Sequence, residues 1–540
     1  MNQLYYGDNL DVLRKSIADE SVDLIYLDPP FNSNADYNAL FRTPKGQQSA
    51  AQMEAFTDTW QWDDATSGQA VTEVKRSSYQ DAAKMLDAMV GFLGKNALTA
   101  YLAMMAVRLV ELHRVLKPTG SLYLHCDPTA SHYLKILLDA VFGARNFRNE
   151  IVWQRYGSHN DSKVFGKVHD IVFFYSKGKV ITFNKQFGVY SADYVKDRFR
   201  YVDANGRRFA EQNLSSPSPR PNLSYPFLAK NGITYPPPAN GWKYTIDRMQ
   251  TLDDEDRLHY PTKLDGRLRF KNFLDEMPGP PVQDIWTDVG LIGGSSPERL
   301  GYPTQKPVAL LERILNASSN PGDVVLDPFC GCGTTVHAAQ KLGRQWIGID
   351  VTHIAIGLIE TRLRSAFPGI DYQVIGTPMD AEAARDFFNR NDPTKKEFEI
   401  WAASKLGFIP QAKKGADGGV DGVRWFGVNE EFRAVVSVKG GRKVDVEMMR
   451  SLDAVVKAQG AQIGVLLTLE RPTKPMEDWA RAAGMCEVPG FAPVNRLQIV
   501  TVEQALALRE RAVEMPARRD DTFRKAPKEE NRGRQGALDL

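Results

Sequence analysis

A short apolar segment closed by two prolines is the feature that most restricts how this chain can fold. Val22–Leu27 is a mostly aliphatic run of six residues, and Asp28, Pro29 and Pro30 follow it directly. Such a run between turn residues is typical of a buried parallel strand. Proline has no N–H to donate to a sheet ladder, so the strand must end there. The segment therefore predicts a parallel sheet with Asp28 at the carboxyl end of one strand.

Helix-like and strand-like segments alternate over two further stretches of the chain. The first stretch comprises residues 97–116 (helix), 121–125 (strand) and 133–141 (helix), and the second comprises 308–317 (helix), 324–326 (strand), 334–342 (helix) and 346–349 (strand). This alternation is the signature of an open, mainly parallel α/β sheet. We therefore expect the α/β fold class.

Residues 154–300 interrupt that rhythm with clustered prolines and short β-like pieces. We interpret them as an inserted domain that lies outside the central sheet. A separate unit follows at 393–510, and the charged segment 511–540 has few large apolar residues, which is typical of disorder. The expected domains are 1–153 and 301–380 for the two halves of the sheet domain, 154–300, 393–510 and the tail 511–540.

Composition excludes several classes of protein. No apolar run is long enough to cross a bilayer, and the first residues do not resemble a secretory signal. Four cysteines in 540 residues cannot form a disulfide framework, and Cys330 and Cys332 lack the spacing of a zinc site. We expect a cytoplasmic protein with no membrane partner.

The tetrapeptide Asp28-Pro29-Pro30-Phe31 suits chemistry on an aromatic amine. Ligands of open α/β sheets bind just beyond the carboxyl ends of the strands. An aromatic amine is a poor nucleophile because its lone pair is delocalised into the ring. A carboxylate from Asp28 and the carbonyl of Pro29 can accept its two N–H bonds, and Phe31 can stack on a flipped base. Taken alone, the tetrapeptide favours a simple strand-ending turn over a functional site.

A second group, Asp327 to Thr335, follows the predicted strand 324–326 and contains Gly331 and Gly333. Glycines at this position let the backbone approach a ligand closely. The third glycine of a dinucleotide-binding loop is absent, since Val336 occupies its place. Asp327 suits the cationic amino-acid end of a methionine-bearing nucleoside, and Asp350, after the next strand, suits its ribose.

In sequence and in order, these two groups resemble the β group of DNA amino-methyltransferases. The resemblance covers residues 1–378 and rests on the segments 6–10, 27–32, 112–121, 302–307, 310–314 and 327–335. It implies a Rossmann-like sheet that binds S-adenosylmethionine and double-stranded DNA, with residues 154–300 as the target-recognition domain. The residues implied for catalysis and the target base are Asp28, Pro29, Pro30 and Phe31. Those implied for the cofactor are Asp8, Thr304, Lys306, Asp327, Phe329, Gly331, Gly333, Thr334 and Asp350.

A basic stretch lies in the inserted region. Residues 154–220 contain twelve Lys and Arg residues against six Asp and Glu, interspersed with aromatic residues. This pattern is found on surfaces that contact phosphates and bases, but also on solvated faces. Candidate DNA contacts are Arg155, Arg207, Arg208, Arg220, Trp242 and Lys243.

The unit at 393–510 contains a second potential site. Thr394 to Glu397 predict a capping box that opens a helix, and Asp421 and Lys439 fall on two strands expected to pair. Together they could hold Mg²⁺ and a phosphate or an attacking water. The unit resembles the restriction-endonuclease fold of the PD-(D/E)xK nucleases, closest to the Mrr-like branch.

The family carries an acidic residue or glutamine two positions before the lysine, where this chain has Ser437. Glu399 could supply the missing carboxylate. Without it, the carboxylate of Asp421 would have to hold the Mg²⁺ alone. The unit would then be an inactive DNA-binding domain.

The sequence thus predicts a DNA methyltransferase that acts on the N6 amine of adenine. The alternatives are an N4-cytosine methyltransferase, a bifunctional restriction-modification enzyme that also cleaves DNA, a non-catalytic DNA-binding protein and, less so, an RNA methyltransferase. A homodimer and a partner from a restriction-modification or defence system are both compatible with the sequence. The recognition sequence cannot be read from it.

Overall fold

The computed structural model describes most of the chain, in two compact units. The units are Met1–Asn184 with Asp284–Leu540, and Lys185–Gln283. The residues described are 2–30, 36–39, 53–57, 61–157, 164–263, 266–293, 296, 298–300, 302, 304–390, 395–411, 419–426, 431–488 and 493–516.

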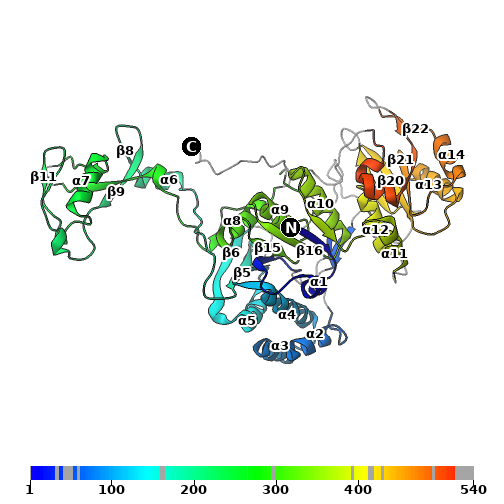
Figure 1. Ribbon diagram of the computed structural model, residues 1–540, viewed down its shortest axis with the longest axis horizontal. Coiled ribbons are helices and arrows are strands. Elements are labelled where there is room, and N and C mark those ends of the chain that lie inside the picture. The colour runs from blue at the N-terminus through cyan, green and yellow to red at the C-terminus, as the bar shows by residue number, and fades with distance from the viewer. Residues whose placement is uncertain are drawn as a thin grey trace. The chain divides into compact units, whose positions relative to one another are not determined.

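A nine-stranded sheet forms the centre of the larger unit (Figure 1). Its order is β14-β6-β7-β5-β2-β15-β16-β1-β17. Every neighbouring pair is parallel except the two made by β7. The strands are β1 (Gln3–Tyr6), β2 (Val22–Leu27), β5 (Leu116–Cys126), β6 (Phe147–Gln154), β7 (His169–Ser176), β14 (Ile285–Trp286), β15 (Val324–Asp327), β16 (Gln345–Asp350) and β17 (Gln373–Ile375). The expected α/β class is confirmed.

The apolar strand β2 lies between β5 and β15, where both faces are covered. Leu24, Ile25 and Leu27 have no exposed surface, which explains why the run is apolar and not alternating. The strand ends before Asp28, as the prolines require. Because β2, β15 and β16 are parallel, their carboxyl ends meet at one edge of the sheet.

Helices cover both sides of this sheet. In Figure 1, α4 and α5 lie on one side of the strands, and α8, α9 and α10 lie on the other. The long helix α4 begins with a capping box between Asn96 and Thr99. Outside residues 185–283, the helical segments before the C-terminal domain are α1 (Asn9–Ser16), α2 (Ser67–Arg76), α3 (Gln80–Leu93), α4 (Ala97–Val115), α5 (Ser131–Phe142), η1 (Ala144–Asn146), α8 (Val308–Ser318), α9 (Thr334–Lys341), α10 (His353–Ala366) and α11 (Ala381–Asn389), and a hairpin pairs β3 (Asp36–Ala39) with β4 (Met53–Thr57).

None of the described helices combines the length and apolar composition needed to cross a membrane.

The inserted region is smaller than the sequence indicated. The expectation that residues 154–300 lie outside the sheet is wrong, because β7 and β14 belong to it. The strand β7 is almost entirely buried and joins as the antiparallel member. An antiparallel strand needs no crossover helix before it. The alternation of helix and strand in the sequence therefore stops here, although the sheet includes the next strand.

The separate unit is therefore residues 185–283. It consists of a four-stranded sheet of order β12-β13-β9-β8, a short hairpin and two helices. The chain enters and leaves it as a hydrogen-bonded pair of segments: Gly188 N–H donates to the Pro280 carbonyl and Val282 N–H to that of Gln186. Its elements are α6 (Ala192–Arg198), β8 (Tyr201–Val202), β9 (Arg208–Asn213), η2 (Pro221–Leu223), β10 (Phe227–Leu228), β11 (Thr234–Tyr235), α7 (Ile246–Asp254), β12 (Leu258–His259), β13 (Arg269–Phe273) and η3 (Leu274–Glu276).

Two of the expected DNA contacts in this unit have structural roles instead. Trp242 is a buried core residue whose indole N–H donates to the Tyr225 carbonyl at 2.7 Å. The guanidinium of Arg207 is held by the carboxylates of Asp275 and Glu276. Arg208 and Arg220 are exposed and Lys243 is half-buried, so these three remain candidates.

The C-terminal domain has a five-stranded sheet of order β18-β19-β20-β21-β24, antiparallel up to β20 and parallel beyond it. The helix expected after Thr394 begins at Lys396, and its N-cap residue, Lys395, makes no side-chain cap; Thr394 itself lies outside the described residues. The elements are α12 (Lys396–Lys405), β18 (Ile409–Pro410), β19 (Gly422–Phe426), β20 (Phe432–Lys439), α13 (Val446–Ala458), β21 (Ile463–Thr468), α14 (Lys474–Ala482), β22 (Met485–Cys486), β23 (Val494–Asn495), β24 (Leu497–Thr501), α15 (Val502–Leu508) and η4 (Arg509–Ala512).

The expected start of a disordered tail at residue 511 is also wrong. Val513 and Met515 pack into the core of the C-terminal domain. Both residues stand among charged ones, so the composition of the segment did not indicate that it belongs to a core.

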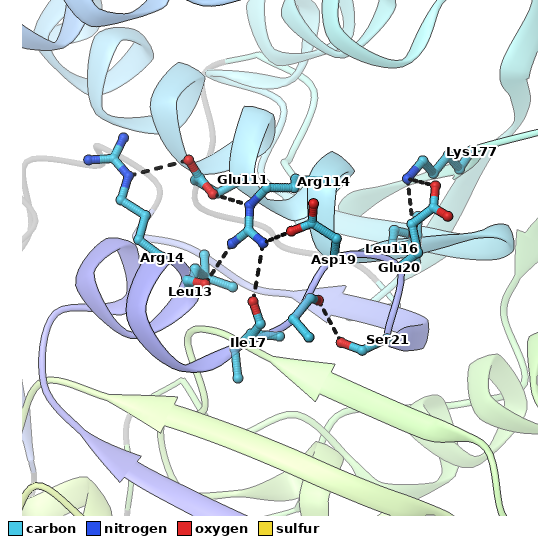
Figure 2. A network of polar contacts seen from close by, with 11 residues as sticks. Leu13, Arg14, Ile17, Asp19, Glu20, Ser21, Glu111, Arg114, Leu116 and Lys177 are labelled. Atoms are coloured by element: carbon cyan, nitrogen blue, oxygen red, sulfur yellow. Dashed lines mark hydrogen bonds and ion pairs between the residues drawn. The ribbon is translucent and has the colours of Figure 1, made fainter.

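Arg114 joins the end of α4 to α1 and to the loop between α1 and β2 (Figure 2). Its guanidinium donates to the carbonyls of Leu13 at 2.7 Å and Ile17 at 3.2 Å, and it pairs with Asp19 and Glu111. These contacts satisfy carbonyls that the end of α1 leaves without helical partners. Arg114 therefore fixes the loop through which the chain enters β2.

We expect Arg114→Ala to lower the free energy of unfolding by about 2 kcal/mol, since it removes the guanidinium that donates to two carbonyls and two carboxylates. Arg114→Lys should recover only part of this loss, because an ammonium cannot reproduce the fork geometry. Urea denaturation followed by circular dichroism measures the effect. Lys15→Ala, which removes an exposed pair with Asp11, is the control and should change stability by less than about 0.5 kcal/mol. An Arg114→Ala variant as stable as the wild type would contradict this role.

Candidate active site

A cavity of about 300 Å³ opens at the carboxyl ends of β1, β2, β15 and β16. This is the place where open α/β sheets bind their ligands. Its lining includes Gly7, Asp8, Asn9, Tyr26, Asp28, Pro29, Pro30, Met104, Arg108, Tyr302, Thr304, Gln305, Lys306, Leu311, Asp327, Pro328, Phe329, Cys330, Gly331, Cys332, Thr334, Thr335, Asp350, Val351 and Thr352. The structure thus brings both sequence motifs into one site.

Asp28 lies directly after β2 and has two differently engaged carboxylate oxygens. Oδ2 accepts a hydrogen bond from the Lys306 ammonium at 2.5 Å. Oδ1 is buried and has no hydrogen-bond partner among the described residues. The site therefore presents a fixed carboxylate with one oxygen available as an acceptor. Phe31, expected beside it, lies outside the described residues.

The pair between Lys306 and Asp28 was not expected from the sequence. The resemblance implied that Lys306 binds the cofactor, whereas its ammonium is bound to the carboxylate expected at the target base. The two residues are 278 positions apart, so no local pattern could have indicated the contact.

Asp327 and Asp350 are the last residues of β15 and β16. Asp350 accepts from the Gly331 N–H at 2.9 Å and from the backbone and hydroxyl of Thr352 at 2.8 and 2.9 Å. Asp327 accepts from the Phe329 N–H at 3.0 Å. Burial raises the pKa of Asp327 to about 7, because the remaining hydrogen bonds only partly offset the loss of water. Burial also raises the pKa of Asp350.

The loop after β15 depends on its two glycines in different ways. Gly331 has a φ of 53° and lines the cavity. Gly333 has a φ of 76°, precedes α9, and is not among the residues that line the cavity. A Cβ at Gly333 would lie 2.7 Å from a side-chain carbon of Ile359, so its role in this structure is close packing against α10.

Several residues of the site were missed by the sequence argument. Asp8 lines the cavity as expected, but it also caps α1 and accepts from Arg108 at 2.8 Å. Asn9 donates to the Pro328 carbonyl at 2.8 Å and thereby connects α1 to the loop after β15. Tyr26 lines the wall beside Asp28. The contacts of Asn9 with Pro328 and of Arg108 with Asp8 join segments that are far apart in the sequence.

The cysteines of the loop, Cys330 and Cys332, are buried, and burial raises the pKa of both thiols. A protonated buried thiol is a poor nucleophile. The Arg362 guanidinium donates to the Cys332 carbonyl at 3.2 Å and to the Thr334 hydroxyl at 3.1 Å. These cysteines are therefore packing residues of a loop that Arg362 holds in place.

The charges of the cavity define the ligand that it fits. Asp28, Asp327 and Asp350 face it, and among the described cations lining it, Lys306 and Arg108 are each bound to a carboxylate. Burying further negative charge is costly unless a cation compensates it. A ligand with cationic groups and hydroxyls meets this requirement, and S-adenosylmethionine has both.

The second potential site is in the C-terminal domain. Asp421 is buried just before β19, and its Oδ2 accepts from the Val438 N–H at 2.7 Å. Burial raises the pKa of Asp421 to about 6 with a smaller contribution from Glu399, against the lowering effect of Lys439. The charges of Glu399 and Lys439 both act on Asp421, and Ser437 is buried on β20. Within the described part of the chain, no group of three or more His, Cys, Asp and Glu side chains could hold a metal ion.

Comparison with known proteins assigns the family. The model of the DNA methylase family matches residues 22–360, which is more than half of the 540 residues. The chain therefore belongs to the DNA methylase family, whose members use S-adenosylmethionine. Within that family it carries a second domain, since residues 394–488 match a restriction endonuclease family.

Individual relatives agree with this assignment. The chain is 29% identical over 370 residues to the type II methyltransferase M.EcaI of Enterobacter cloacae, which covers 67% of this chain and 69% of the relative. It is 26% identical over 361 residues to the Mod subunit of the type III restriction-modification enzyme StyLTI of Salmonella typhimurium, covering 64% of this chain and half of the relative. A solved structure, a putative DNA modification methylase from Thermus thermophilus, covers 69% of this chain and 99% of its own at 16% identity with a TM-score of 0.32. The assignment rests on the sequence matches, because this superposition is weak.

The raised pKa of Asp327 leads to a prediction for cofactor binding. A cationic ligand favours the carboxylate, whereas the free protein protonates Asp327 as the pH falls below about 7. The affinity for S-adenosylmethionine should therefore decrease below that pH, by at most about tenfold per pH unit for one group. Isothermal titration between about pH 5.5 and about pH 8.5 measures this. Asp327→Asn should bind more weakly at high pH and lose this pH dependence, and an unchanged dependence in that variant would contradict the assignment.

Proposed function

We propose that this DNA methyltransferase transfers the methyl group to the N6 amine of adenine. The observation that carries the proposal is Asp28, whose Oδ1 is a buried acceptor in the cavity wall with no partner among the described residues. An exocyclic amine can donate to it. The preference for adenine rests on aspartate at the head of the tetrapeptide, since the cytosine enzymes that the chain resembles more often carry serine there.

The residues of the site would promote attack by the amine in two ways. Asp28 Oδ1 and the Pro29 carbonyl accept the two N–H bonds and localise the lone pair on nitrogen. Lys306 holds the other oxygen of Asp28 and so fixes the direction of the acceptor. S-adenosylmethionine, when bound, supplies a methyl group on a cationic sulfur, for which Asp327 and Asp350 provide negative surroundings. Alignment of the two reactants would then be the main catalytic contribution.

Further properties follow from this proposal. Residues 185–283 would recognise the target sequence, with Arg208, Arg220 and Lys243 available to phosphates or bases. The likeness to a Mod subunit supports a role in a restriction-modification system with a partner protein. A homodimer is a further proposal. An intracellular DNA substrate and the low cysteine content support a cytoplasmic location.

Nucleoside mass spectrometry tests the choice of base. DNA without prior methylation is treated with the enzyme and the cofactor, digested to nucleosides and analysed. We expect N6-methyladenine. Finding N4-methylcytosine alone would overturn the adenine assignment and retain the family.

We expect Asp28→Ala to lower the single-turnover rate by at least about a hundredfold, because a preorganised acceptor contributes about 3 kcal/mol or more in the transition state. This variant also leaves Lys306 uncompensated in the cavity, which should weaken binding of the cationic cofactor. The double variant Asp28→Ala/Lys306→Met should recover cofactor binding without recovering methyl transfer. If either variant transferred methyl groups at the wild-type rate, Asp28 would have no part in the mechanism.

DNA cleavage by the C-terminal domain is a second candidate function. The action of the charges of Glu399 and Lys439 on Asp421 favours it. Ser437 opposes it, because no carboxylate stands at the family position on β20, and Mg²⁺ is normally held by one or two carboxylates with substrate phosphate. We therefore expect weak cleavage or none, with DNA binding retained.

The test is a plasmid assay with Mg²⁺ or Mn²⁺, in which wild type is compared with Asp421→Ala and Lys439→Ala. Strong cleavage by the wild type that both substitutions abolish would establish a bifunctional enzyme and contradict our expectation. The exposed Lys474→Ala serves as a control on the same domain.

A further inference from the structure

A second cavity lies within the larger unit, where α10 contacts the C-terminal domain. It has a volume of about 450 Å³, and among the residues that the structure describes it shares none with the lining of the candidate active site. Its walls come from α10, from α12, and from α15 with η4. This volume is in the range of small-molecule sites, which often lie where two domains meet. The methyl transfer proposed above uses no residue of this cavity.

One carboxylate at this cavity is shared by three cations. Oε2 of Glu360 on α10 lies 3.1 Å from the ammonium of Lys405, the last residue of α12. Its Oε1 lies 3.0 Å from the guanidinium of Arg509 in η4 and 3.2 Å from that of Arg364, one turn further along α10. Within the described part of the chain, these cations form no ion pair with any other carboxylate. Three positive groups therefore converge on a single negative one.

The lining as a whole shows the same imbalance. Among the described residues, four cationic side chains line the cavity against two carboxylates, those of Glu360 and Glu510. His353 adds no charge, because burial lowers its pKa to about 3. The cavity therefore has an excess of two positive charges. The cations are Arg364, Lys405, Arg509 and Arg511.

The two buried members of the cluster respond to this excess in opposite ways. Burial raises the pKa of Glu360, but the three cations outweigh burial, so the pKa lies below its ordinary value. Burial lowers the pKa of Lys405, and Glu360 does not restore it, since the like charges of Arg509 and Arg364 lower it further. The carboxylate is thus more than compensated, whereas the ammonium lacks negative charge. A further anion in the cavity would supply that charge.

We propose that this cavity binds a phosphate monoester, carried either by a free mononucleotide or by the 5′ end of a DNA strand. A phosphate monoester has a charge of about −1.5 to −2 at pH 7, which matches the excess of two, whereas a phosphodiester of the DNA backbone has a single charge. Arg364 and Arg509 are accessible to such a ligand, since 44% and 34% of their side chains are exposed. A guanidinium has five N–H donors, so each can bind a phosphate while it contacts Glu360.

Apolar side chains beside the cations provide surface for the rest of the ligand. Ile356 and Trp401 line the cavity and are buried, and Leu508 lines it with 46% of its surface exposed. A sugar or a base can pack against these side chains while the phosphate reaches the guanidinium groups. The phosphate would then bridge α10 and η4, so a bound ligand would stabilise the contact between α10 and the C-terminal domain. This inference depends neither on the proposed base nor on the methyl transfer.

The test is isothermal titration of the full-length protein, with the candidate active site saturated by S-adenosylmethionine so that it does not take up the probes. The small probes are AMP, cyclic AMP and adenosine, which share a base but differ in charge. We expect AMP to bind at least about tenfold more tightly than cyclic AMP, because charge-assisted hydrogen bonds to phosphate are lost with the second charge. Adenosine should not bind.

A DNA duplex with 5′ phosphates, compared with the same duplex without them, distinguishes the two sources of the phosphate. Tighter binding of the phosphorylated duplex would assign the ligand to a DNA end. Binding of AMP with no difference between the duplexes would assign it to a free nucleotide.

Substitutions at the cluster test the charge balance directly. Arg509→Gln and Arg364→Gln should each weaken binding of the phosphate probe about tenfold, because each removes a charged donor. Glu360→Gln should strengthen it by about threefold or more, since it removes the carboxylate that competes for the same cations. A purely structural ion network predicts no gain in affinity from Glu360→Gln. Circular dichroism shows whether each variant retains the fold.

Arg481→Gln is the matched control on the same domain. Arg481 pairs with Glu477 and Asp478 on α14 and lies outside the lining of the cavity. Its substitution should leave the affinity unchanged.

The proposal would be overturned if AMP bound no more tightly than cyclic AMP and the 5′ phosphates added nothing to binding of the duplex. It would equally be overturned if Arg509→Gln and Arg364→Gln left the affinity of the phosphate probe unchanged. These two substitutions decide the matter even if Glu360→Gln fails to fold, because both guanidinium groups are partly exposed.

Discussion

Buried negative charge at one edge of the central sheet is the constraint on which the rest of the site depends. Parallel strands end at the same edge, so the carboxylates after β2, β15 and β16 share one cavity. Each is partly satisfied by a different means: Lys306 binds Asp28, and backbone N–H groups bind Asp327 and Asp350. These hydrogen bonds do not fully compensate the loss of water around Asp327, so its pKa is raised. A cationic ligand compensates the buried negative charge, and this requirement links the fold to the class of cofactor.

The parts of the site that the sequence predicted correctly are those that a single strand and its following turn define. Asp28 comes directly after β2, Asp327 and Asp350 are the last residues of β15 and β16, and the location of the cavity follows from the parallel direction of these strands. The order of the motifs predicted the family, which the comparison confirmed. These features are local, so a short stretch of sequence contains all the information needed.

The features that escaped prediction depend on pairing between distant segments. β7 joins the sheet antiparallel, without a helix, and was therefore assigned to the insert. Lys306 contacts Asp28 from 278 positions away, and hydrogen bonds join Tyr26, His125 and Asp170 on three neighbouring strands. Apolar periodicity marks which residues are buried, but it does not say which polar side chains will meet behind a cavity. Trp242 illustrates the same limit, because an aromatic residue in a basic stretch proved to be a core residue.

The two segments that join residues 185–283 to the rest of the chain are bound to each other within that unit. The pair of hydrogen bonds between 186–188 and 280–282 closes the unit on itself, so its sheet and core need no strand from outside. Because these two segments are bound to each other, the unit can be exchanged as a whole. Recombination between related genes at these positions can replace one unit by another while the carboxylate cavity stays intact. Given the proposed role of residues 185–283 in target recognition, enzymes with a common chemistry can in this way diverge in the DNA they mark without passing through an inactive ancestor.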